Sequence, residues 1–292
     1  MKPLKVGVQQ AGQRLDSTLS VLAPELSRSS WQALITNSKV TLNGKTETRP
    51  AKTVKKGDTI SAELPVLPAS QPDVPILYED DDVVVFDKPA GMLTHAKGEL
   101  AEEWTLADIA KTKVQDDPSN RPGIVHRLDR ATSGVIIVAK HQSAKQFLQK
   151  QFANRKVEKT YRAIVRGRVE EDSFLIDMPI ARDFKNPQQF AVNTDGKTAQ
   201  TAVNTIKSSS KASLLKLTPK TGRTHQLRVH LKSVGHPIIG DVLYGSSIDK
   251  QEGRLYLHAS RLKLVLPGGS NSVFESELPD DFKAGVNKYG LA

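Results

Sequence analysis

The sequence predicts an α+β protein in which a mixed, mainly antiparallel central β-sheet has flanking helices and a small N-terminal α/β domain precedes it. Strand-like segments outnumber helix-like ones without strict alternation, which favours such a sheet over a parallel one. A proline-rich stretch, PVLPASQPDVP, separates two parts of different pattern. The 292 residues, 38% hydrophobic and 25% charged, suffice for two globular domains. We therefore expect a domain at 1–65, a linker at 66–75 and a second domain at 76–292.

The first 65 residues have the pattern of two short helices and a hairpin. Leucines recur at helical spacing in RLDSTLSVL, and the serines of LSRSSWQALI can cap a second helix. The Asn43-Gly44 pair in VTLNGK is typical of a hairpin turn, and KKGDTISAEL follows as a further strand. This order predicts a compact, basic module.

The remainder of the chain is dominated by apolar runs that end in turn residues. The strands expected from these runs are DVVVFDKPAG, GVIIVAK, TYRAIVRG and SLLKLTPKTG. The helices expected from periodicity are TLADIAKT, SAKQFLQKQFANR and THQLRVHLKSVG. In the last of these, Thr224 is the expected N-cap and Gly235 the expected stop.

The charge distribution indicates a polyanionic partner. The net charge is +10, and residues 121–168 alone hold twelve Lys or Arg against two Asp or Glu. A basic excess can also serve solubility alone, but it then has no reason to concentrate in one segment. The chain has no cysteine, so disulfides, thiolate metal sites and a cysteine nucleophile are excluded. Its first residues lack the apolar core of a signal peptide and no run reaches membrane-span length, so we expect a cytoplasmic protein without a membrane.

Metal and nucleotide sites are poorly supported by the sequence. His225 and His230 are five residues apart, whereas two zinc ligands on one helical face are four apart. The glycine-containing stretches match neither the dinucleotide fingerprint nor the phosphate loop. We therefore expect no metal and no cofactor, and structural hydrogen bonds for the histidines.

Asp129 is the leading candidate for chemistry. It is the only carboxylate between Pro118 and Val157, and His126, Arg127 and Arg130 surround it in the segment HRLDR. Nearby cations favour the ionised carboxylate, which is a poor acid at neutral pH but a competent nucleophile or base. From the spacing alone, a structural ion pair and a catalytic acid are equally good interpretations.

The segment GIVHRLDRATSGVIIVAK closely resembles the signature of the large-subunit-type (RluA-like) family of RNA pseudouridine synthases. Further blocks follow the family's order: DKPAGMLTH, VEKTYRAIV, DGKTAQT, LTPKTGRTHQLRVHLKSVGHPIIGDVLYG and LYLHASRLKLVLP. The resemblance implies a pseudouridine synthase fold and the isomerisation of uridine in RNA without metal or cofactor.

The resemblance also implies roles for single residues. Asp129 corresponds to the catalytic acid, Tyr161 to the aromatic residue against the uracil, and Arg223 to the arginine that pairs with the acid. Arg127 corresponds to the arginine that enters the RNA stack, and its neighbours His126 and Arg130 are expected to contact RNA.

The N-terminal module resembles the alpha-L RNA-binding domain, in RLDSTL, SRSSWQALI, KVTLNGK and KKGDTI. In that family Arg28 and the second helix face RNA phosphates. A dimerisation or folding cap is the alternative for this module. For the whole chain, ribosomal RNA of the large subunit is the expected partner. The alternatives are transfer RNA, a non-catalytic ribosome-assembly protein, and an RNA N-glycosidase that releases free base.

Overall fold

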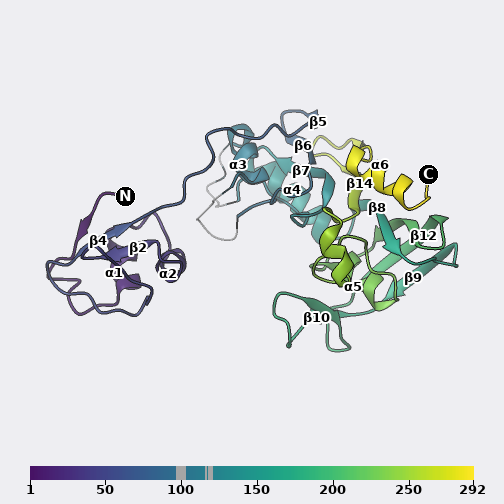
Figure 1. Cartoon of the computed structure of the whole chain (residues 1–292). Helices are drawn as coiled ribbons and strands as arrows, with labels where there is room; N and C mark the ends of the chain where they lie inside the picture. The colour runs from purple at the N-terminus through teal and green to yellow at the C-terminus, as the bar shows by residue number, and fades with distance from the viewer. Residues whose placement is uncertain (97–102, 116, 118–120) are drawn as a thin grey trace. The chain divides into compact units, whose positions relative to one another are not determined.

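The computed structural model describes residues 1–96, 103–115, 117 and 121–292 (Figure 1). These residues form two compact units. The first consists of Met1–Gln71 with His95–Thr105, and the second of Pro72–Thr94 with Leu106–Ala292. Among the described residues, none of the helices has both the length and the apolar character needed to span a bilayer.

The first unit has the predicted order of two helices and a small sheet. The helices are α1 (Leu15–Leu22) and α2 (Arg28–Thr36); the strands are β1 (Leu4–Lys5), β2 (Val40–Leu42), β3 (Lys45–Thr46) and β4 (Thr59–Ala62). They pair antiparallel in the order β1-β4-β2-β3. Ser27 caps α2 by accepting a hydrogen bond from the Ser30 N–H, and Trp31 is fully buried in the core. Asn43 and Gly44 both have positive φ, as the tight hairpin requires.

The second unit is built on one large sheet. Its strands are β5 (Ile76–Glu79), β6 (Val83–Lys88), β7 (Ser133–Ala139), β8 (Glu158–Arg166), β9 (Ser173–Asp177), β12 (Gln200–Ser208), β13 (Ala212–Pro219), β14 (Leu257–Val265) and β15 (Asn271–Glu275). They run in the order β5-β6-β7-β14-β8-β13-β12-β9, and β15 pairs with β14. Of the described pairings, β7 with β14 is parallel and the others are antiparallel, which confirms the predicted mixed, mainly antiparallel sheet. A separate hairpin joins β10 (Ile180–Arg182) to β11 (Phe190–Val192).

Helices cover both faces of the β6–β7 part of this sheet. Alternate residues of a strand point to opposite faces. On β6, Val83 and Val85 pack in a cluster with Leu148 of α4 (Gln142–Ala153). The intervening Val84 packs instead with Leu106 of α3 (Leu106–Ala110), which the short 3-10 helix η1 (Lys111–Lys113) continues. Because both faces are covered, β7 is buried along its whole length.

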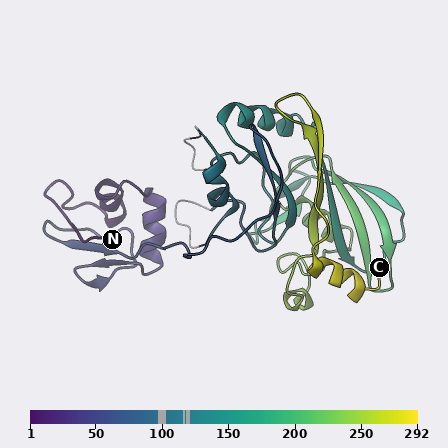
Figure 2. The ribbon, with the colours of Figure 1, turned by 90° about the horizontal axis from the view of Figure 1, so that it is seen from above.

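The other end of the sheet packs on α5 (Gln226–Ser233) and α6 (Asp280–Lys288), which carry Leu231 and Phe282 into the largest core cluster. Figure 2 shows the chain ending in α6 beside this sheet. The 3-10 helix η2 (Ser247–Gln251) lies in the connection between α5 and β14.

One predicted helix start is wrong. Helix α5 begins at Gln226, and its N-cap is His225, not Thr224. The His225 backbone is in the left-handed region with φ 55°, so the chain reverses sharply just before the helix. A non-glycine residue rarely adopts this conformation. The turn places His225 and Arg228 of α5 against the loop that carries Asp129.

Candidate active site

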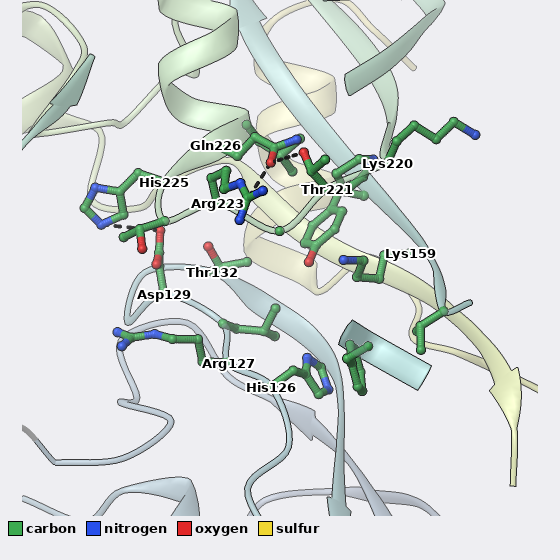
Figure 3. Close-up of a pocket in the computed structure, with 18 of the residues that line it drawn as sticks. His126, Arg127, Asp129, Thr132, Lys159, Lys220, Thr221, Arg223, His225 and Gln226 are labelled. Atoms are coloured by element: carbon green, nitrogen blue, oxygen red, sulfur yellow. Dashed lines mark hydrogen bonds and ion pairs between the residues drawn. The ribbon is translucent and has the colours of Figure 1, made fainter. Parts of the chain in front are cut away.

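A cavity of about 500 Å³ lies in the second unit where β8 begins and β13 ends. Two segments form most of its wall, 125–132 before β7 and 219–228 between β13 and α5. Lys159 and Tyr161 of β8 also line it, as do Leu257 and several residues of 152–157. Figure 3 shows these side chains converging from the two sides of the pocket. The structure therefore brings together residues about a hundred positions apart in sequence.

The loop that carries Asp129 is held through its backbone. The Thr94 hydroxyl donates to the Leu128 carbonyl (2.8 Å) and accepts from the Leu128 N–H (3.1 Å). The fully buried Lys88 donates to the Arg130 carbonyl (3.3 Å) and to the Met92 carbonyl (2.9 Å). Burial lowers the pKa of Lys88 to about 7, an effect that the nearby Asp129 carboxylate opposes. These contacts fix the backbone on both sides of Asp129.

Arg228 of α5 pairs with the Asp129 carboxylate. Its Nη1 lies 3.1 Å from Asp129 Oδ2, and its Nε and Nη2 bind the two oxygens of Asp241 at 2.7 and 2.8 Å. The Arg228 side chain is 9% exposed and Asp241 is fully buried, whereas Asp129 is 21% exposed. Burial opposes the charge of Arg228, but the two carboxylates hold its pKa above the usual value. The guanidinium is thus a fixed bridge between a structural acid and an acid that faces the pocket.

The predicted pairing of Arg223 with Asp129 is therefore wrong. Arg223 precedes α5 and lines the pocket, but its Nε donates to the Thr198 carbonyl at 3.0 Å. Its backbone N–H donates to the Gln226 side chain, which fixes the turn. Sequence reasoning missed Arg228 because it placed the partner of Asp129 in the loop before α5. The partner lies in the first turn of α5, where the buried Arg228 side chain reaches Asp129.

His225 is the other titratable group beside Asp129. Its Nε2 lies 3.8 Å from Asp129 Oδ2, and its Nδ1 is hydrogen bonded to the Tyr244 hydroxyl at 2.7 Å. The Tyr244 oxygen also accepts from the Phe190 N–H (2.9 Å), so the hydroxyl proton is available for His225 Nδ1. Burial lowers the pKa of His225, which favours a neutral ring. With the Tyr244 hydroxyl as the donor to Nδ1, the proton of the neutral ring lies on Nε2, on the side of Asp129.

Tyr161 forms a largely apolar wall of the pocket. Its ring packs against two core clusters, and burial, reinforced by the Asp129 charge, raises the pKa of its hydroxyl. The phenol is therefore neutral. A neutral aromatic ring beside a carboxylate can stack on a planar base and hydrogen bond to it.

Three other predicted residues lie close to this pocket or in its wall. Arg127 is exposed and lines the cavity, whereas Arg130 is exposed but does not contribute to the lining. His126 lines the cavity, stacks on Phe152 at 4.6 Å, and accepts a hydrogen bond from the Ile137 N–H. Burial lowers the pKa of His126 to about 3, so the ring is neutral and cannot bind a phosphate by charge. Contacts of these three residues with RNA stay predictions.

Arg28 lies in the first unit, where it is one of two arginines held by a single acid. Asp16 is fully buried and accepts hydrogen bonds from Arg14 (2.9 Å), Arg28 (3.1 Å) and Gln32 (2.6 Å). These bonds hold the pKa of Asp16 well below its usual range, with Arg14 the largest contributor. Both arginine side chains remain about half exposed, at 46% and 49%. Sequence reasoning identified Arg28 but not Arg14.

Two family models match the chain. The model described as RNA pseudouridylate synthase matches residues 82–233, which include both walls of the pocket. The S4 domain model matches residues 13–60, which contain Arg14, Arg28 and both helices of the first unit.

Curated relatives match over most of the length. A protein of Aquifex aeolicus named as an uncharacterized RNA pseudouridine synthase is 37% identical over 96% of this chain and 95% of its own. The protein of Nitrosomonas europaea named ribosomal large subunit pseudouridine synthase D is 36% identical over 94% of this chain and 83% of its own. Among solved structures, human RNA pseudouridylate synthase domain containing 1 superposes with a TM-score of 0.59 at 28% identity, over 74% of this chain and 86% of its own.

An acid held by a buried arginine, beside an aromatic wall and attached to an RNA-binding module, defines an enzyme that acts on RNA. The chain belongs to the RNA pseudouridylate synthase family. It is an isomerase of uridine in RNA, as the sequence predicted.

Proposed function

We propose that the chain isomerises specific uridines of large-subunit ribosomal RNA to pseudouridine, with Asp129 as the catalytic acid. The observation that carries the site is the Asp129–Arg228–Asp241 chain, because it fixes one carboxylate in a cavity of about 500 Å³. The ribosomal target rests on relatives named ribosomal large subunit pseudouridine synthase D at 36–40% identity. A cytoplasmic location belongs to the same proposal, because it follows from that substrate.

Each residue of the pocket has a physical task in this proposal. Arg228 pairs with the Asp129 carboxylate and orients it, because the guanidinium is itself fixed by Asp241. Asp129 acts on the ribose as nucleophile or base, and Tyr161 supplies the face against which the uracil stacks. Arg127 is exposed at the cavity, so its planar guanidinium can fill the space that the target nucleotide leaves in the RNA stack.

The exposed cations extend the pocket toward a polyanion. Lys220 and Arg155 line the cavity with Arg127, and all three are exposed. Phosphate contacts of this kind position RNA without reading its sequence. Arg28 and Arg14 of the first unit serve the same purpose on a separate surface.

The test is pseudouridine mapping of total RNA from cells with and without the gene, followed by reaction of the purified protein with the RNA found. The expected result is loss of one or a few pseudouridines in large-subunit ribosomal RNA. The product in vitro should be an isomer of unchanged mass. Loss of sites in transfer RNA alone would contradict the proposed target, and abasic sites or unchanged RNA would contradict the reaction.

A further inference from the structure

Lys159 is a cation inside the pocket to which the proposed function gives no task. Its side chain is partly buried, lines the cavity and points into the pocket in Figure 3. Among the residues that the structure describes, it has no hydrogen-bond acceptor and no carboxylate partner. A buried charge without a partner costs folding free energy. The ammonium is therefore able to take a partner from outside the folded chain.

The position of Lys159 on β8 places its side chain in the wall of the pocket beside Tyr161. Lys159 and Tyr161 are two residues apart, so both project from the same face of the strand. The β8–β13 ladder ends at the pair Tyr161–Leu217, so Lys159 lies two residues beyond the last pair of these strands and is paired on its other side with Leu262 of β14. A Cβ added at Gly222 would lie 3.7 Å from Lys159 Nζ, so the ammonium lies against the loop that leads to Arg223 and α5.

The chemistry of the reaction creates a charge that the residues assigned above do not neutralise. When the bond from ribose C1′ to uracil N1 breaks, its electron pair leaves with the ring and spreads over N1 and the two carbonyl oxygens. Asp129 either bonds to C1′ or takes the C2′ proton, and in both cases the detached ring is an anion. Arg228 already binds two carboxylates. Tyr161 is neutral, so it brings no positive charge.

We infer that the Lys159 ammonium donates a hydrogen bond to a carbonyl oxygen of the detached uracil and stabilises its negative charge; this rests on the proposed function. The ring then turns, and C5 bonds to C1′ with the electron pair of the anion. Asp129 recovers its carboxylate from C1′ or returns the proton to C2′. Finally C5 loses its proton and N1 gains one, so atoms and charge balance. A donor placed where charge develops acts mainly on the transition state.

Burial supports such a role, because it strengthens the interaction of the ammonium with an anion in the same cavity. Burial also lowers the pKa of Lys159. The proposed role requires the charged ammonium. Activity should therefore fall as the pH rises through the pKa of Lys159, which lies below that of an ordinary lysine.

The experiment compares Lys159→Met and Lys159→Arg in the full-length protein, with Lys216→Met as a matched control. Lys216 is an exposed lysine on β13 that does not line the pocket. Single-turnover rates at saturating protein should fall about 100-fold for the Met variant, which is typical for removal of one such donor. The Arg variant should recover part of the rate, and the Lys216→Met variant should match wild type. The dissociation constant for RNA should change by less than about threefold, since the interaction forms only as the bond breaks.

A second substrate separates charge stabilisation from a structural role. An RNA with 5-fluorouridine at the target releases a ring whose anion the fluorine already stabilises. The loss on Lys159→Met should therefore be about tenfold smaller for cleavage of that substrate. Equal losses on both substrates would overturn the inference. So would a weaker dissociation constant with a flatter salt slope and an unchanged rate, because that is the pattern of a phosphate contact.

Folding and pH provide independent readings. Lys159→Met should unfold at the same temperature as wild type or higher, because it removes an unpaired buried charge. If the Met variant does not fold, the Arg variant still gives the comparison of the two substrates.

In Lys159→Arg the alkaline loss of rate should move to higher pH, because a guanidinium stays charged; an unmoved alkaline limb would refute the role of Lys159. Asp129→Asn in the same assay separates the proposed function from the role of Lys159. An active Asp129→Asn variant would contradict the proposed function, whereas a Lys159→Met variant with the wild-type rate would contradict only the role of Lys159.

Discussion

The two units each contain an acid bound to arginine, but with opposite burial. In the first unit Asp16 is fully buried and its partners Arg14 and Arg28 are about half exposed. In the second unit Arg228 is 9% exposed while Asp129, at 21%, faces the cavity. The buried ion of each pair is the support and the exposed ion is the one available to a ligand. The first unit thereby offers cations to a ligand and the second offers an anion, which in the proposed function meet phosphate and ribose respectively.

In both pairs, the buried ion holds the more exposed ion in place, and this gives the buried charge a role other than stability. A buried ion pair by itself contributes little net stability, because desolvation offsets the attraction. Asp16 receives a third hydrogen bond from Gln32, and Arg228 is anchored by Asp241. These additional partners fix the geometry of the exposed ion, and orientation is what binding and catalysis require.

The largest expected effect comes from Asp129→Asn. The amide keeps the shape but cannot act as an anionic nucleophile or base, so we expect turnover to fall by about 10³-fold or more. The dissociation constant for RNA, measured by filter binding, should change little. Turnover within about tenfold of wild type would exclude Asp129 as the catalytic group.

Arg228→Met should reduce both turnover and stability. It leaves Asp241 as an uncompensated buried charge, which costs about 3–5 kcal/mol of unfolding free energy. The double variant Arg228→Met with Asp241→Asn should recover much of the thermal stability in a melting experiment but not the activity. Activity restored with stability would show that Arg228 acts only through folding.

Arg228 also shows how far sequence reasoning reaches. The fold class, Asp129 in its loop and the strand that carries Tyr161 were all predicted, because local motifs and apolar runs specify them. The helix was expected to start at Thr224, but the left-handed turn at His225 delays it to Gln226. Such a turn depends on tertiary contacts, here the Tyr244 hydroxyl, and has no local signal.

Some strands were missed for a related reason. β9 and β12 lie at one edge of the large sheet, and β9 alternates between exposed and covered residues. The search for continuous β-branched runs detects strands covered on both faces, such as β7, and overlooks half-exposed ones. A search for alternation would have been the better test.

Deletion of residues 1–65 tests whether the first unit contributes to RNA binding while the second folds without it. We expect the remaining chain to keep its thermal transition and to bind RNA more weakly, with a smaller salt slope. The measurement is the dissociation constant at several salt concentrations beside a melting curve. Aggregation of the shortened chain would show that the proposed boundary at residue 65 is wrong.

Arg14→Gln combined with Arg28→Gln should have a milder effect of the same kind, because each amide removes the charge but can still donate a hydrogen bond to the buried Asp16. Each arginine that contacts a phosphate contributes about one unit to the salt slope, so the slope should fall by about two. The single-turnover rate at saturating protein should equal that of wild type, because neither residue belongs to the pocket. A reduced rate at saturation would contradict the assignment of the first unit to binding alone.

The smallest effect is expected for Arg223→Leu. The Arg223 Nε is held by the Thr198 carbonyl, so the stem is fixed while the terminal nitrogens can reach a phosphate. We therefore expect a salt slope lower by about one and a rate at saturation close to wild type, with Arg223→Lys retaining most of the affinity. Arg228→Met is the matched comparison, since it removes an arginine from the same wall but one bound to Asp129. If Arg223→Leu instead lowers the rate as much as Arg228→Met, then Asp129 exchanges its arginine partner when RNA binds. The fixed Arg228 bridge would then describe the free enzyme alone.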